Sequence, residues 1–65
     1  MEYYKIILMP EEQWLDLKRV WQIVKLSDED GLTDDNWKPI PGDEHLTYEE
    51  AQKRVEAYEQ AQLDK

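Results

Sequence analysis

The feature that most constrains this chain is that a stretch of only 65 residues contains no cysteine. A chain this short buries only about 60% of the surface that its unfolded form exposes, so small domains commonly rely on disulfides, a metal or oligomerisation. Disulfides and thiolate metal sites are excluded here, which fits a reducing compartment. Three Trp and four Tyr, with no Phe, must supply much of the apolar surface. We expect a single small domain, residues 1–65.

The clearest element in the sequence is a helix in the C-terminal third. Thr47 and Glu50 have the spacing of a capping box, which marks a helix start. An apolar stripe follows at helical spacing: Tyr48, Ala51, Val55, Tyr58 and Ala61. Two i,i+4 ion pairs are expected on the helix: Glu49 with Lys53 and Glu50 with Arg54. Because the stripe is thin, we expect this helix to cover a small sheet through aromatic contacts.

The N-terminal half favours strands. The run from Glu2 to Met9 is rich in Tyr and Ile, and Pro10 ends it. Residues 10–26 are ambiguous, because Pro10 in a first turn and several apolar residues at helical spacing suit a helix. However, the run from Val20 to Val24 is β-branched and aromatic, as strands prefer. We therefore expect a strand at 19–26 after a short helical or irregular piece at 10–17.

A short third strand is expected around Asn36–Lys38, and Pro39 and Pro41 limit it to a sheet edge or to irregular structure. The predicted fold class is thus α+β: a small two- or three-stranded antiparallel sheet covered by a C-terminal helix. The alternative is a mostly α domain in which residues 10–26 are helical.

The net charge of −8 lies entirely in the middle third of the chain. Residues 28–50 hold nine acidic residues against Lys38 alone, whereas acidic and basic residues balance in 1–27 and in 51–65. Direct binding to nucleic acid requires basic patches, which the chain lacks, and an anionic membrane surface would repel it. The sequence offers neither the roughly 20 apolar residues of a membrane span nor the pattern of a signal peptide. We therefore expect a cytoplasmic protein.

No motif in the sequence indicates catalysis or metal binding. His45 is the only histidine, and it has neither a nucleophile partner nor a second soft ligand. The acidic run that ends at Gly31 does not match an EF-hand, because Gly31 at position 6 puts Leu26 at position 1 and Trp37 at position 12. We expect no enzyme, no catalytic residues, no cofactor and no metal.

The acidic middle third has two interpretations. Such a block usually keeps a protein soluble, and its functional alternative is recognition of a basic protein surface. We expect a non-enzymatic protein-binding module, an inhibitor or adaptor. A more specific version of this hypothesis is a nucleic-acid mimic with carboxylates in place of phosphates. The expected partner-binding residues are Asp28, Glu29, Asp30, Asp34, Asp35, Trp37, Asp43 and Glu44, with Trp37 as a partly exposed apolar anchor. The alternative function is that of a structural or assembly protein, a homodimer formed through a sheet edge.

Overall fold

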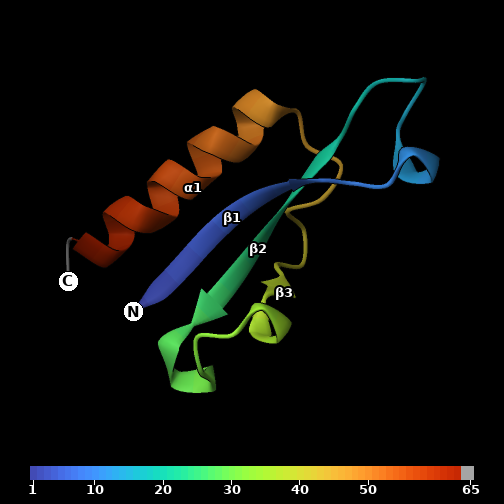
Figure 1. Cartoon of the computed structure of the whole chain (residues 1–65). Coiled ribbons are helices and arrows are strands. Elements are labelled where there is room, and N and C mark those ends of the chain that lie inside the picture. Colours follow the sequence, from blue (N-terminus) through green and yellow to red (C-terminus); the bar gives the residue numbers. More distant parts are fainter. Residues whose placement is uncertain (64–65) are drawn as a thin grey trace.

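Three strands and one helix make up the regular structure of this protein in a computed structural model, which describes residues 1–63 (Figure 1). They are β1 (Glu2–Leu8), β2 (Trp21–Ser27), β3 (Lys38–Pro39) and α1 (Tyr48–Leu63). The strands form one antiparallel sheet in the order β1-β2-β3, and α1 packs against β1 and β2. The expected α+β class, a small two- or three-stranded antiparallel sheet covered by a C-terminal helix, is confirmed. The third strand, expected around Asn36–Lys38, lies at Lys38–Pro39, because Asn36 belongs to a 3₁₀ turn.

Strands β1 and β2 form a hairpin whose register pairs Glu2 with Ser27 and Leu8 with Trp21. The alternative of a helix across 10–26 is wrong. The only helical piece within 10–26 is one 3₁₀ turn, Glu11–Gln13, and β2 begins at Trp21. The strand prevails because Ile23 and Val24 both become buried in the sheet, where β-branched side chains pack well.

The core lies between the sheet and α1. Ile23, Leu46 and Ala51 are buried at its centre. Partly buried side chains surround them: Tyr4, Ile6, Trp21, Ile40, Val55 and Tyr58. The rings of Tyr4 and Tyr58 stack with centroids 5.0 Å apart, and those of Trp21 and Tyr48 meet edge to face at 4.9 Å. The helix therefore covers the sheet through aromatic contacts, as the thin stripe indicates.

Helix α1 begins at the predicted capping box. The N–H of Glu50 donates to Oγ1 of Thr47 at 3.1 Å, which satisfies one of the free donors at the helix start. Glu49 and Lys53 form the expected ion pair at 3.9 Å. The expected pair of Glu50 with Arg54 is wrong, because Arg54 turns towards residues 42–43. Within the described residues, no helix is both long and apolar enough to cross a membrane.

Candidate protein-binding site

The turn region that follows β2 carries a cluster of exposed carboxylates, which we call the acidic end: Asp28, Glu29, Asp30, Asp34 and Asp35. Two 3₁₀ turns, Asp28–Asp30 and Asp34–Asn36, carry these residues beyond the end of the strand (green in Figure 1). Asn36 holds the two turns together, since its Nδ2 donates to the carbonyls of Asp30 at 2.6 Å and Gly31 at 3.0 Å. The acidic end is therefore a hydrogen-bonded structure.

Ion pairs neutralise only part of this charge. Asp28 lies 2.8 Å from the terminal ammonium of Met1, and the hydrogen bond between them lowers the pKa of Asp28 and raises that of the ammonium. Asp30 lies 3.9 Å from Nζ of Lys38. Within residues 1–63, no ion pair forms at Glu29, Asp34 or Asp35. Asp34 and Asp35 therefore present uncompensated negative charge to solvent, whereas the charge of Glu29 is partly offset by the nearby terminal ammonium of Met1.

Trp37 lies directly after the acidic end, on the sheet face opposite α1. It is half-buried, so the expected partial exposure is confirmed. Nζ of Lys5 sits 5.6 Å from the centroid of its ring. Lys5, Val24, Asp34, Trp37 and Pro39 are among the residues that line a shallow hollow of about 540 Å³. An indole face, an apolar strand surface and the Asp34 carboxylate therefore share one concave surface.

The prediction that Asp43 belongs to an exposed acidic face is wrong. Its side chain is only 5% exposed, and it accepts hydrogen bonds from Nη1 of Arg54 and from the hydroxyl of Tyr58. Its backbone carbonyl accepts from the N–H of Ile23 at 3.0 Å. Burial of a charge is tolerated when it is paired and hydrogen-bonded, and Asp43 fulfils both conditions. Asp43 therefore joins the segment before α1 to β2 and to the helix.

Glu44 is exposed, but it lies apart from the acidic end. The segment that carries it runs along the first half of β2, where Leu46 pairs with Trp21. The acidic end instead follows the last residue of β2, Ser27. The eight predicted residues thus divide into the five carboxylates of the acidic end with Trp37 beside them, a buried Asp43 and a separate Glu44.

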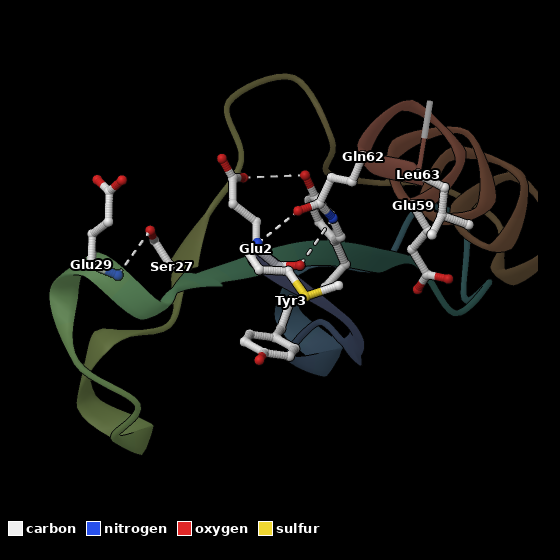
Figure 2. Close-up of a pocket in the computed structure, with 9 residues that line it drawn as sticks. Glu2, Tyr3, Ser27, Glu29, Glu59, Gln62 and Leu63 are labelled. Carbon is white, nitrogen blue, oxygen red and sulfur yellow. Dashed lines mark hydrogen bonds between the residues drawn. The ribbon is translucent and has the colours of Figure 1, made fainter. Parts of the chain in front are cut away.

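The structure adds two carboxylates that the sequence did not single out. A hollow of about 630 Å³ lies between the start of β1, the acidic end and the end of α1, and Glu2, Glu29 and Glu59 line it together with Tyr3 (Figure 2). In the sequence, Glu59 is indistinguishable from any other solvent-facing helix residue. Only the packing of α1 against β1 brings it to this hollow, so no local signal could have found it.

The described residues supply no metal site, since residues 1–63 hold no group of three His, Asp or Glu side chains placed to share an ion. Comparisons with protein-family models, with curated proteins and with solved structures give no match for this chain. The case for function therefore depends on the geometry and charge of the site.

Proposed function

We propose that this protein is a non-enzymatic protein-binding module that offers its acidic end and Trp37 to a basic surface of a partner protein. The observation that carries the proposal is the position of Glu29, Asp34 and Asp35. These residues have no ion pair within the described part of the chain, they stand on turns that Asn36 holds together, and Trp37 follows them directly. A basic partner would supply the missing countercharge.

The energetics favour a role in association over a role in stability. Like charges held close together repel one another, so the unpaired carboxylates of the acidic end do not stabilise the fold. A concentrated field of one sign instead attracts a basic partner over about a Debye length, roughly 8 Å at physiological salt, and it repels acidic competitors. We therefore expect the acidic end to act mainly on the association rate.

Trp37 supports a specific contact within this electrostatic field. Lys5 already lies over the indole ring, so this ring accepts a cation. Asp34 lines the same hollow. An arginine of the partner suits this pairing of ring and carboxylate, because its planar guanidinium stacks on indole and donates hydrogen bonds to carboxylate oxygens. We expect such an arginine to displace Lys5 from the ring.

The sharper form of the proposal is mimicry of nucleic acid, in which the partner is a nucleic-acid-binding protein and the carboxylates occupy its phosphate sites. Mimicry predicts that nucleic acid and the acidic protein compete for binding to the partner. A partner that binds both at once would restrict the function to that of an inhibitor or adaptor acting at another basic surface.

Two variants with the same net charge test the proposal. One replaces the unpaired carboxylates of the acidic end: Glu29→Gln, Asp34→Asn and Asp35→Asn. The control replaces exposed carboxylates elsewhere: Glu11→Gln, Glu12→Gln and Glu56→Gln. With a partner recovered by cross-linking in the native cell, the first variant should associate more slowly and with a weaker salt dependence, whereas the control should resemble the wild type. Equal association rates for the two variants would overturn the proposal.

A further inference from the structure

The outer edge of β1 is a regular strand edge that the described residues leave largely unpaired. In antiparallel strands, the peptide groups of alternate residues point towards the same neighbour. The N–H of Met9 donates to the carbonyl of Val20 at 3.0 Å, so the odd-numbered residues of β1 face β2. Tyr4, Ile6 and Leu8 therefore turn their N–H and C=O groups outward, and no hydrogen bond within residues 1–63 engages these outward groups.

The chain itself closes both ends of this edge. Gln62 lies against the outward peptide group of Glu2, where its Oε1 accepts from the Glu2 N–H at 2.7 Å and its Nε2 donates to the Glu2 carbonyl at 3.0 Å (Figure 2). At the other end, Pro10 has no N–H to offer. What remains is a segment with three outward-facing residues, Tyr4, Ile6 and Leu8, which we call the open edge.

We propose that a second copy of this chain pairs antiparallel with the open edge, with Ile6 of one copy opposite Ile6 of the other. This register also places Tyr4 of each copy opposite Leu8 of the other, so each pair exchanges both of its N–H···O bonds. Every outward peptide group of the open edge then has a partner, and none is left over at the closed ends. A two-fold axis through the Ile6 pair generates the second half of the contact from the first.

The side chains of the open edge suit this partner. Edge strands that avoid pairing usually carry charges, prolines or bulges, and Tyr4, Ile6 and Leu8 provide none of these. Leu8 is 42% exposed in the single chain, and in the proposed register it lies beside Tyr4 of the second copy, which covers part of its apolar surface. For a small cysteine-free chain, such a contact adds the apolar burial that its own core lacks.

The charge distribution permits self-association in spite of the net charge of −8. The first 27 residues, which contain the open edge, are balanced in charge. The acidic end of each copy follows its own Ser27, next to Glu2 in register, so the two-fold axis sends the two acidic ends to opposite ends of the joined sheet. The remaining repulsion between the copies should be screened by salt, so the dimer should strengthen as salt is added.

Sedimentation tests this inference over a concentration series at low and at high salt. The expected mass rises from 7.9 kDa towards twice that value, at lower concentration when salt is high. Chemical synthesis of the chain with an N-methyl group on Ile6 removes the central outward donor without changing the side chain. The control carries the N-methyl group on Leu32, which is 61% exposed and whose N–H donates no hydrogen bond within residues 1–63. We expect the Ile6 variant to stay monomeric and the Leu32 variant to dimerise like the wild type.

Amide hydrogen exchange on the unmodified chain gives a second measurement that does not depend on how the variants fold. The amides of Tyr4, Ile6 and Leu8 should gain protection as the concentration rises, whereas those of Lys5 and Ile7, which face β2, should be protected throughout. A mass of 7.9 kDa at all concentrations, or exchange at Ile6 that does not depend on concentration, would overturn the dimer. The proposed function would survive that result, because it uses another surface and has the opposite salt dependence.

Discussion

At the scale of single residues, Asp43 illustrates how a carboxylate in an acidic segment comes to serve the fold. Its side chain is buried and accepts from Arg54 and Tyr58, while its carbonyl binds the N–H of Ile23 in β2. Hydrogen bonds to a charged group contribute about 1.5–3 kcal/mol, and removal of the carboxylate also leaves the hydroxyl of Tyr58 without its acceptor. Asp43 therefore has a large effect on stability for an acidic residue.

We expect Asp43→Ala to lower the free energy of unfolding by about 1.5–3 kcal/mol. Asp35→Ala is the matched control, because Asp35 is exposed and forms no ion pair within the described residues, and it should change that free energy by less than about 0.5 kcal/mol. Urea denaturation followed by tryptophan fluorescence measures both variants. Similar stabilities for the two would show that the contacts of Asp43 do not hold the fold together.

Tyr58 should give the protein a stability that depends on pH in the alkaline range. The hydrogen bond to Asp43, together with burial and the nearby charge of Asp43, raises the pKa of Tyr58 above its ordinary value of 10.0. The unfolded chain therefore releases this proton at a lower pH than the folded chain does. The contribution to stability is complete below pH 10.0 and is lost as the pH rises through the folded-state pKa.

The expected result is that the free energy of unfolding of the wild type falls above pH 10.0, and that Tyr58→Phe, although less stable at neutral pH, loses less over the same range. Tyr3→Phe serves as the control, because Tyr3 lies exposed and its hydroxyl takes part in no hydrogen bond within residues 1–63. Denaturation at a series of alkaline pH values gives the three profiles. Parallel profiles for the wild type and Tyr58→Phe would refute this account of Tyr58.

At the scale of elements, the start of α1 is defined by a single side chain. Thr47→Ala removes the acceptor for the N–H of Glu50, and we expect it to cost about 0.5–2 kcal/mol of stability. Thr33→Ala offers a matched control, since Thr33 precedes the Asp34–Asn36 turn without a capping hydrogen bond from its side chain. Equal denaturation midpoints for the two variants would mean that α1 does not depend on its cap.

The elements that the sequence predicted correctly are those that local chemistry determines. The capping box at Thr47 and Glu50, the stop at Pro10 and the β-branched run before Lys25 all act over a few residues. What the sequence could not provide depends on contacts between distant segments. Glu50 lies four residues before Arg54, at a spacing that suits an ion pair. Arg54 pairs with Asp43 instead, because the turn before α1 folds back onto the helix.

The candidate site, too, has features that local sequence determines and features that depend on contacts between distant segments. The sequence located the charge of the acidic end and the partial exposure of Trp37, because both follow from composition and from the neighbouring prolines. It also assigned Asp43 and Glu44 to the same face, although tertiary contacts bury Asp43 and hold Glu44 beside the first half of β2. Glu59 reaches the hollow that Glu2 and Glu29 also line only through the packing of α1, and no local sequence pattern indicates that packing.

At the scale of the whole molecule, the protein is thin, with extents of 39 × 26 × 14 Å, because α1 covers only one face of the sheet. Trp37 lies on the other face of the sheet, next to the acidic end. The open edge of β1 lies on a different side of the sheet. The two proposed contacts therefore use separate surfaces. Salt should weaken binding to a basic partner and strengthen the dimer, so measurements at two salt concentrations distinguish them.

The central claim is that the acidic end and Trp37 are the surface that meets the partner. The most direct measurement is an NMR footprint of the partner on the isotopically labelled chain, recorded residue by residue. The account predicts that the largest changes fall within residues 28–37 and on Lys5, and that they shrink together as salt is added. A footprint on α1 or on the outer edge of β1, with residues 28–37 unchanged, would contradict it and leave the acidic end as a solubilising surface.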